Sequence, residues 1–449
     1  MSKKHTYRTV DVQALDIPRL LEQLPQEQVV VGIDVAKERQ VVTLADPSGA
    51  PKVLCRFEHP RQTAEFLGML GALGQAGKKL EVALEPTGTY GDALMYQCHA
   101  HGHLVYLVSP KKTHDAKELF DGVPSSHDAK DSTLVARLHA QGLSRRWEPK
   151  PEQERTLRAL VDQREMYALS VERMQGQLEA LMARHFPEMG QHLDVRAQSS
   201  ALKLLVEFPD PARMAQDPER VRQLLRQASH GLLKPEAIEG VLKAAAASQG
   251  VAPVPAEQEL MRTTASELLR LGELLARLKG LLQAQMGTMP EVQPVQKAVG
   301  VVSTAVLLAY LGMLGRYSSL GVLEKACGLN LKVSSSGRDS DKKHAPGLHI
   351  TKRGPGIVRK YLYLATLRWL QEDPVARAWY EQRSGYTEQS KGRAVVALMR
   401  KLVAKLWHLS RGAAYDPGRL FDLRRLSPQA PQKGPFGRPL KHAPVEVSA

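Results

Sequence analysis

The sequence lacks three features that mark common classes of protein. It has only three cysteines, Cys55, Cys98 and Cys327, and this odd, scattered set excludes a disulfide framework and fits a reducing compartment. Aromatic residues make up 5% of the chain, and no RNA-recognition motif of stacking aromatic residues is present. No apolar run reaches the roughly 18 residues of a membrane span, and residues 1–20 contain no apolar signal-peptide core. We therefore expect a cytoplasmic protein that does not contact a membrane.

What the sequence does have is basic charge. The chain holds 62 Lys and Arg residues against 47 Asp and Glu residues, which gives a formal net charge of +15. This excess favours a polyanionic partner, with nucleic acid as the first choice and an anionic membrane surface as the second. At 449 residues with 43% hydrophobic residues, the chain is long enough for two or three domains, each with a buried core.

The N-terminal third has the pattern of an α/β domain. After a polar lead-in over residues 1–27, short β-branched apolar runs predict buried strands, and a helical pattern over residues 91–101 separates the last two of them. A short turn at residues 36–39 makes the first two strands a hairpin. The predicted strands are residues 29–35, 40–45, 79–85 and 104–108. Strands that alternate with helices indicate a mixed sheet, and we assign this domain to residues 28–148.

Two heptad ladders follow and predict two long helices. They are joined through residues 187–255, whose composition suggests a small helical insertion. Such a pair forms either an antiparallel coiled-coil arm or a dimer seam, and we assign it to residues 149–290. Arg164 interrupts the first ladder. The ladder residues are Leu157, Leu160, Tyr167, Val171, Met174, Leu178 and Leu181, then Met261, Thr264, Leu268, Leu271, Leu275, Leu278 and Leu282.

The C-terminal part predicts a mainly helical domain over residues 291–411. Its helices are expected at residues 294–314, 320–327, 356–371 and 392–410, with a polar loop at residues 332–349. Residues 412–449 contain six prolines and mostly basic charge, so we expect a disordered tail there.

Four carboxylates of the N-terminal domain stand out. Asp34 lies in an apolar strand, where an unpaired charge is costly, and Glu85 ends another strand immediately before Pro86. Asp128 and Asp131 stand three apart, on one face of a helix's first turn. Carboxylates from separate elements suit Mg²⁺, and two such ions about 4 Å apart can activate a nucleophile and stabilise a leaving oxygen of a phosphodiester. Each residue alone also has a structural interpretation, since first-turn acids favour the helix dipole.

These residues carry a family resemblance. GIDVAK, EPTGTY and DAKDSTLVARL, in this order, resemble the RuvC-like, RNase H-fold domain of the DEDD transposases of the insertion sequence one-ten family. AVGVVSTAVLLAYLG, CGLNLKVSSSG and HITKRGPGIVRKYL resemble the C-terminal transposase domain of the same family. The resemblance covers roughly residues 27–145 and 292–410. It implies an RNase H-like mixed-sheet domain, a coiled-coil arm and a mainly helical C-terminal domain, in a bacterial, nucleoid-associated homodimer or homotetramer.

The resemblance also implies a mechanism. Members of the family use a serine of the C-terminal domain as nucleophile beside the Mg²⁺ site of the four carboxylates, and a non-coding bridge RNA pairs with donor and target DNA. Ser336, next to a glycine, matches this serine best, and Ser335 is second. The chain departs from the family in having Ser126-His127 where a Lys-Thr or Lys-Ser pair is usual, and Leu331 where a proline is usual. The basic residues expected to contact phosphates are Arg338, Lys342, Lys343, Lys352, Arg353, Arg359 and Lys360.

Other functions remain as alternatives. A RuvC-like structure-specific endonuclease would use the same carboxylates to activate water and would not need Ser336. A sugar-kinase or actin-like ATPase shares the opening strand but needs a second phosphate loop and an adenosine motif, which the sequence lacks. A non-catalytic DNA-binding derivative is disfavoured because the acidic set is complete. The cysteine and histidines between residues 98 and 103 fit no standard zinc spacing.

Overall fold

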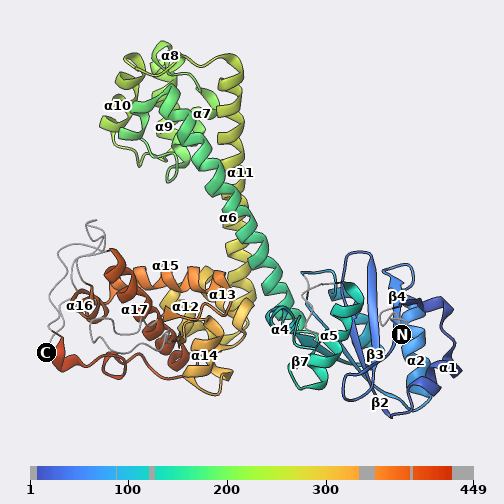
Figure 1. Ribbon diagram of the computed structural model, residues 1–449. Coiled ribbons are helices and arrows are strands. Elements are labelled where there is room, and N and C mark those ends of the chain that lie inside the picture. Colours follow the sequence, from blue (N-terminus) through green and yellow to red (C-terminus); the bar gives the residue numbers. More distant parts are fainter. Residues whose placement is uncertain (1–7, 87, 121–126, 333–348, 385–387, 427–449) are drawn as a thin grey trace, which may run out of the picture. The chain divides into compact units, whose positions relative to one another are not determined.

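The computed structural model describes residues 8–86, 88–120, 127–332, 349–384 and 388–426. The chain divides into two compact units, Met1–Lys150 and Pro151–Ala449 (Figure 1). Within the described residues, no helix combines the length and apolar character needed to cross a membrane.

The first unit is built on a seven-stranded mixed sheet with the order β1-β4-β3-β2-β5-β6-β7. The central strand β2 pairs antiparallel with β3 and parallel with β5, and β5 pairs parallel with β6. The four strands predicted from sequence and the helix between the last two are confirmed within a residue or two. The strands are β1 (Val10–Asp11), β2 (Gln28–Asp34), β3 (Arg39–Ala45), β4 (Pro51–Glu58), β5 (Lys79–Leu84), β6 (Leu104–Val108) and β7 (Ser144–Trp147).

Helices cover both faces of this sheet. One face packs against α1 (Ile17–Gln23), α2 (Thr63–Gln75) and α3 (Asp92–Ala100), and the other against α5 (Asp128–Ala140). Successive side chains of a strand point to opposite faces, so β2 directs Val29, Val31 and Ile33 toward the first face. The same alternation directs Val30, Gly32 and Asp34 toward α5.

The prediction that residues 1–27 are a polar lead-in needs correction. Their described part, residues 8–27, belongs to the sheet domain. Strand β1 pairs parallel with β4, and Leu20 and Leu24 are buried in the core. The Gln62 side-chain amide donates to Asp11 at 3.0 Å and ties this segment down. The polar composition hid the segment, because only a few of its side chains enter the core.

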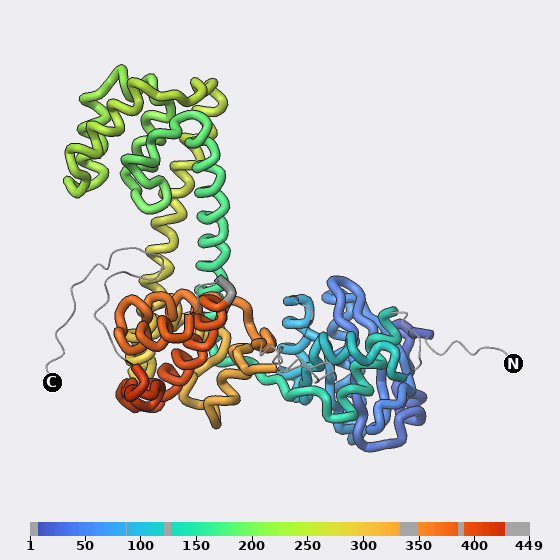
Figure 2. The backbone as a smooth tube through the Cα atoms, turned by 60° about the vertical axis from the view of Figure 1, so that its left-hand side comes forward, coloured from blue at the N-terminus to red at the C-terminus, as the bar shows by residue number. Residues whose placement is uncertain are grey.

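The two heptad ladders form α6 (Glu152–His185) and α11 (Pro255–Gly287), which lie side by side in Figures 1 and 2. They are antiparallel: Leu157 near the start of α6 shares a cluster with Leu282 near the end of α11, and Leu178 shares another with Leu268. The ladders therefore pair within one chain. Residues between them form the predicted helical insertion, with α7 (Ser199–Glu207), α8 (Pro211–Gln216), α9 (Pro218–Ala228) and α10 (Pro235–Ala246).

The break in the first ladder at Arg164 has a structural reason. Here α6 contacts α15 (Gly356–Glu372) of the C-terminal helices. Arg164 donates to the Tyr361 hydroxyl at 2.6 Å, and Glu165 accepts from Lys360 at 3.1 Å. Arg164 thus stands in the ladder where α6 makes polar contacts with α15.

The C-terminal helices surround the largest apolar core of the second unit. The predicted helix at residues 294–314 is broken at Gly300, whose positive φ of 80° separates two shorter helices. The helices are α12 (Gln293–Val299), α13 (Val301–Leu311), α14 (Leu320–Cys327), α15, α16 (Pro374–Arg383) and α17 (Glu388–Leu409). The predicted boundary at residue 411 is wrong, because Phe421 and Leu426 are buried in this core. Residues 427–449 of the expected tail lie outside the described residues.

Candidate metal centre

Two strands place Asp34 and Glu85 at one edge of the sheet. In the parallel pair β2–β5, Ile33 is in register with Leu84, so the next residue of each strand is one of these two acids. The alternation that directs Asp34 toward α5 also applies to β5, where Glu81, Ala83 and Glu85 share that face. Both carboxylates therefore lie at the carboxyl edge of the strands and on the side of the sheet that α5 covers.

Helix α5 reaches this edge because the sheet gives it close access. A Cβ atom at Gly32 would lie 2.4 Å from the Ser132 carbonyl oxygen and 2.7 Å from the Ala136 Cβ, so only glycine fits there. Thr43, the register partner of Gly32 on β3, is fully buried. Its hydroxyl lies 2.8 Å from the Ser132 hydroxyl and 3.0 Å from the Thr133 hydroxyl. This contact sets the height of α5 above the sheet, and with it the position of the helix's first turn.

The first turn of α5 carries Asp128 and Asp131, and both act on Asp34. The pKa of Asp34 is raised to about 7, first by burial and then by the negative charges of Asp131, Asp128 and Glu85, while Lys117 opposes the rise. Asp131, Asp128 and Glu85 therefore each lie near enough to Asp34 for their negative charges to raise its pKa.

Glu85 is held by a residue that the sequence did not reveal. Thr113, on the short helix α4 (Pro110–Asp115), is 5% exposed, and its hydroxyl lies 2.5 Å from the Glu85 carboxylate. The same hydroxyl lies 2.9 Å from the Pro110 carbonyl oxygen, its other acceptor. The contact joins residues far apart in the chain, so the only sequence signal is a threonine soon after the end of a predicted strand.

His127 caps the helix that carries the two aspartates. Its Nδ1 accepts a hydrogen bond from the Lys130 backbone N–H at 3.2 Å. An N-cap acceptor satisfies one of the free N–H groups of the first turn. This residue stands where the family usually has a threonine or serine, which are common N-cap residues. The exchange thus preserves an acceptor at the N-cap.

The donor set fits a hard cation. Mg²⁺ binds few protein carboxylates and fills its remaining positions with water or phosphate oxygens. Within the described residues, no three His, Cys, Asp or Glu side chains lie close enough to hold one ion together, so the carboxylates do not form a closed cage. Burial and the neighbouring carboxylates raise the pKa of Asp34 to about 7, and a cation bound beside it would favour its charged form. The chemistry of the donor set therefore suits Mg²⁺, while the geometry of the described residues does not bring three donors around one ion.

The predicted nucleophile lies outside the described residues. This applies to Ser335 and Ser336, and also to three of the basic residues, Arg338, Lys342 and Lys343. On either side of that segment the chain pairs with itself, as β8 (Leu331–Lys332) and β9 (His349–Ile350) form an antiparallel ribbon.

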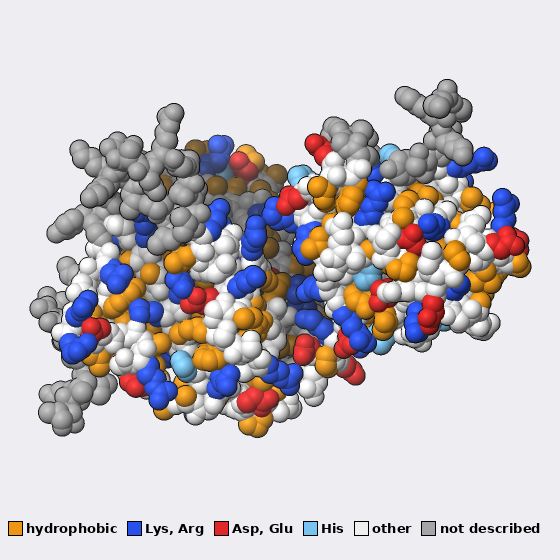
Figure 3. Space-filling view, turned by 60° about the horizontal axis from the view of Figure 1, so that its bottom comes forward, with side chains coloured by type: hydrophobic (Ala, Val, Ile, Leu, Met, Phe, Trp, Pro, Cys, Tyr) orange, Lys and Arg blue, Asp and Glu red, His pale blue; other side chains and the backbone are white. Residues whose placement is uncertain are grey.

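The other four basic residues fall into two groups. Lys352 and Arg353 are exposed, and the Lys352 backbone has a φ of 54°. Arg359 donates to the Gly354 carbonyl at 2.7 Å, and Lys360 pairs with Glu165, so these two have partners within the chain. Elsewhere, Lys and Arg side chains are spread over the face seen in Figure 3, with acidic side chains among them.

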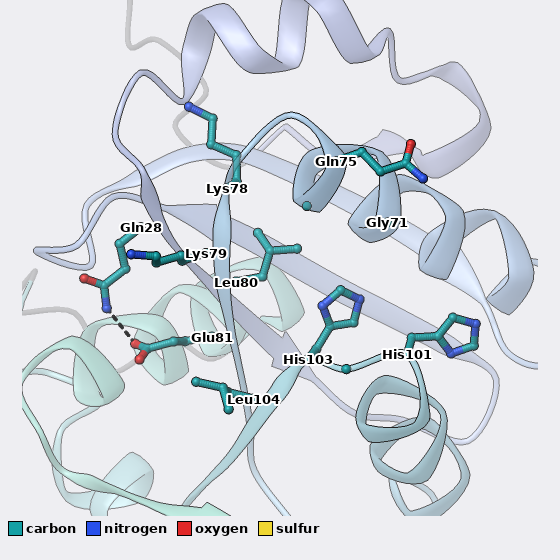
Figure 4. A pocket seen from close by; sticks show the side chains of 12 residues that line it. Gln28, Gly71, Gln75, Lys78, Lys79, Leu80, Glu81, His101, His103 and Leu104 are labelled. Atoms are coloured by element: carbon teal, nitrogen blue, oxygen red, sulfur yellow. Dashed lines mark hydrogen bonds between the residues drawn. The ribbon is translucent and has the colours of Figure 1, made fainter.

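A hollow of about 710 Å³ lies at the opposite end of the same strands (Figure 4). It is lined by the first residues of β2, β5 and β6, including Gln28, Lys79 and Leu104. Glu81 is the one carboxylate among its lining residues, so the hollow is distinct from the carboxylate edge. His101 and His103 line it as well, and they belong to no group of three metal ligands among the residues that the structure describes.

Two family models match the chain. The model of the DEDD transposases, described as "Transposase", matches residues 31–187, which include all four carboxylates. The model described as "Transposase IS116/IS110/IS902 family" matches residues 296–381. Together they cover more than half of the 449 residues. The predicted resemblance to this family is thereby confirmed at both ends of the chain.

Two curated proteins are similar to part of the chain. The Pilin gene-inverting protein of Moraxella bovis is 35% identical over 103 residues, or 23% of this chain and 31% of that protein. The Pilin gene-inverting protein of Moraxella lacunata is 34% identical over 103 residues, with the same shares. The chain thus spans about a third of the length of the curated relatives it matches. With both family models matched in their proper order, the chain belongs to the IS116/IS110/IS902 family of transposases.

Proposed function

We propose that the protein is a Mg²⁺-dependent DNA recombinase that moves an insertion sequence by cleaving and exchanging DNA strands. The observation that carries the proposal is the crowding of Asp131, Asp128 and Glu85 around Asp34, within the segment matched by the transposase model. Net basic charge and membership of a transposase family support DNA as the substrate. The curated relatives support it too, since their name describes inversion of a gene, which is a recombination of DNA.

The sheet supports an RNase H-like fold for the first unit. In that fold a central strand has an antiparallel neighbour on one side and parallel neighbours on the other. Strand β2 has this arrangement, with β3 and β4 on one side and β5 and β6 on the other. Asp34 at the end of the central strand then takes the place of the first metal-binding carboxylate.

The Mg²⁺ site would be held by Asp34, Glu85, Asp128 and Asp131. Bound there, Mg²⁺ would polarise a phosphodiester and neutralise charge on its oxygens. The chain's part is to position these oxygens: Thr113 orients the Glu85 carboxylate, and the Gly32 contact holds α5 against the sheet. Rigid placement of this kind is worth several orders of magnitude in rate for phosphoryl transfer.

Ser336 would be the nucleophile. Its Oγ attacks the phosphorus of a DNA phosphodiester and loses its proton, the bond from phosphorus to the leaving sugar oxygen breaks, and that oxygen departs as a hydroxyl. The released hydroxyl then attacks the phosphoserine on the partner strand, which joins the exchanged strands and returns the Ser336 hydroxyl. No free DNA end is needed at any step.

The partners follow from this scheme. Exchange between two duplexes requires donor and target DNA and at least two copies of Ser336, so a homodimer or homotetramer would act. A non-coding bridge RNA would pair with both DNAs and choose the sites. Lys352 and Arg353, exposed beside the serine-containing segment, are the described basic residues best placed for phosphate contacts.

Covalent adducts test the proposal. Protein, Mg²⁺, supercoiled donor DNA and the RNA flanking the element are incubated together, and protein–DNA adducts are resolved on a denaturing gel. We expect adducts with the wild type and with Ser335→Ala, and none with Ser336→Ala or Asp34→Asn. Nicked DNA without adduct would instead favour a structure-specific endonuclease that uses metal-activated water. An adduct that persists in Ser336→Ala would remove Ser336 as the nucleophile.

A further inference from the structure

The end of α5 farthest from its aspartates carries a buried histidine with two side-chain partners. His139 is 7% exposed. Its Nε2 lies 3.0 Å from the Glu81 carboxylate of β5, and its Nδ1 lies 2.7 Å from the Ser144 hydroxyl of β7. One imidazole thus links the last turn of the helix to two strands of the sheet.

Strand alternation brings these partners to one face. Glu81 precedes Ala83 and Glu85 by steps of two on β5, so it points toward α5 as they do. Ser144 is in register with Val108, a residue that packs against α5. Tyr106, two residues before Val108, also lies on this face, and its ring centroid is 4.5 Å from that of His139.

The carboxylate in this group is fully engaged. Besides His139, Glu81 accepts from the Gln28 side-chain amide at 2.9 Å, drawn as a dashed line in Figure 4. The Tyr106 hydroxyl donates to its other oxygen at 3.4 Å. The turn after α5 is held as well, because Lys112 donates to the Leu143 carbonyl at 2.9 Å.

We propose that the Glu81–His139–Ser144 group positions the metal-binding turn of α5, so that His139 acts on the carboxylate site through the helix. This inference rests on the proposed function. His139 is a positioning residue: it is buried between helix and sheet, where DNA has no access, and it lies two turns from Asp131.

The geometry explains how a distant residue can act. Helix α5 is seated over Gly32 at Ser132 and Ala136 and packs on the sheet through Leu134, Val135 and Leu138, and the His139 contacts add a polar anchor at its last turn. Without that anchor, only this packing sets the tilt of the helix. Asp128 lies about 6 Å along the axis from Ser132, so a tilt of ~10° about Ser132 moves it by about 1 Å, whereas Asp131, next to Ser132, moves less. Displacements of this size are large for a metal or catalytic site.

The test replaces His139 by Phe, which keeps a ring against Tyr106 but loses both hydrogen bonds. The matched control is Phe66→Leu, which disturbs the stacked Phe57–Phe66 pair on the other face of the sheet. A milder second variant, Ser144→Ala, removes one of the two bonds and serves if His139→Phe folds poorly. Two readouts are used: the Mg²⁺ concentration at half-maximal stabilisation, and amide hydrogen exchange of residues 129–133 without metal.

We expect His139→Phe to raise the half-maximal Mg²⁺ concentration about tenfold, as for other outer-shell changes, and to speed exchange in the first turn of α5. DNA cleavage should recover at saturating Mg²⁺, and Phe66→Leu should change neither readout beyond its loss of stability. The inference is overturned if both variants shift both readouts equally, or if His139→Phe shifts neither. A wild type that does not respond to Mg²⁺ would overturn the proposed function, while hydrogen exchange would still decide the role of His139.

Discussion

The two ends of α5 meet acidic side chains of the sheet in opposite ways. At its first turn, Asp128 and Asp131 face Asp34 and Glu85, and the pKa of Asp34 is raised to about 7 by burial and by these negative charges. At its last turn, the single carboxylate of Glu81 meets an imidazole, an amide and a phenol.

We interpret Glu81 as a structural acid and the carboxylates near Asp34 as the proposed functional set. Asp34 of β2 and the acids Glu81 and Glu85 of the β5 segment point toward the same face of the sheet. The Glu81 carboxylate has three side-chain contacts, with His139, Gln28 and Tyr106. We interpret the grouping of Asp131, Asp128 and Glu85 near Asp34, which raises the pKa of Asp34, as the place where a cation would bind.

The largest effect is expected from a substitution at the first turn of α5, among the carboxylates near Asp34. Asp131→Asn should lower DNA cleavage by about a thousandfold or more, because a charged ligand of the reacting phosphate's metal is lost. Glu81→Gln, the same change at the satisfied end, should lower cleavage by about tenfold at most. Rates of adduct formation at saturating Mg²⁺ measure both. If Asp131→Asn and Glu81→Gln lowered the cleavage rate equally, the two ends of α5 would not differ in function as described.

The next largest effect is expected at the contact between Gly32 of β2 and Ser132 of α5, which lies between the two ends of the helix. Gly32→Ala places a Cβ 2.4 Å from the Ser132 carbonyl, a backbone atom that cannot move aside, and should lower the free energy of unfolding by about 2–3 kcal/mol. Gly68→Ala in α2 meets no atom within 4 Å and should stabilise by about 0.5–1 kcal/mol. Urea denaturation gives both values. A neutral Gly32→Ala would mean that α5 is not seated on the sheet as described.

A smaller effect should appear with pH in the absence of Mg²⁺. The folded-state pKa of Asp34, about 7, lies above its unfolded value, so the folded form binds the extra proton between roughly pH 4 and 7. Stability should therefore fall as pH rises through this window, by about 1–2 kcal/mol once partial exposure is allowed for. Thermal unfolding of wild type and Asp34→Asn from pH 5 to 8 isolates this contribution. If the stability of Asp34→Asn changed with pH as steeply as that of the wild type, the pH dependence would come from groups other than Asp34.

The smallest expected effect concerns the orientation of Glu85. Thr113→Val keeps the shape of the side chain but removes the hydroxyl that lies 2.5 Å from that carboxylate. Cleavage at limiting Mg²⁺ should fall several-fold, equivalent to about 1 kcal/mol for one hydrogen bond. Thr263→Val, which loses a hydroxyl contact to its own exposed helix, serves as control. Cleavage by Thr113→Val at the wild-type rate would show that Glu85 needs no such support.

Sequence reasoning singled out the four carboxylates as candidates and did not detect the contacts of Glu81, for a physical reason. An acid inside a β-branched run, such as Asp34, can be detected from the sequence. Its apolar neighbours predict a buried strand, and a charged side chain is unexpected in such a strand. The contacts of Glu81 with His139 and of Thr113 with Glu85 join residues 58 and 28 positions apart, and no local pattern reports such pairs. The pairing of β1 and the burial of Phe421 were missed in the same way, since each depends on a distant partner.

The most direct test of the account is a Mg²⁺ titration followed by the melting temperature of wild type, Asp34→Asn and Asp46→Asn. Asp46 is a suitable control because its pKa is lowered to about 2, chiefly by a hydrogen bond from Ser48 and with help from Lys52, so it has its partners already. We predict that Mg²⁺ raises the melting temperature of the wild type and of Asp46→Asn. Asp34→Asn should start higher without metal and gain nothing from it. A wild type unmoved by about 10 mM Mg²⁺, or an Asp34→Asn that responds equally, would contradict the metal centre.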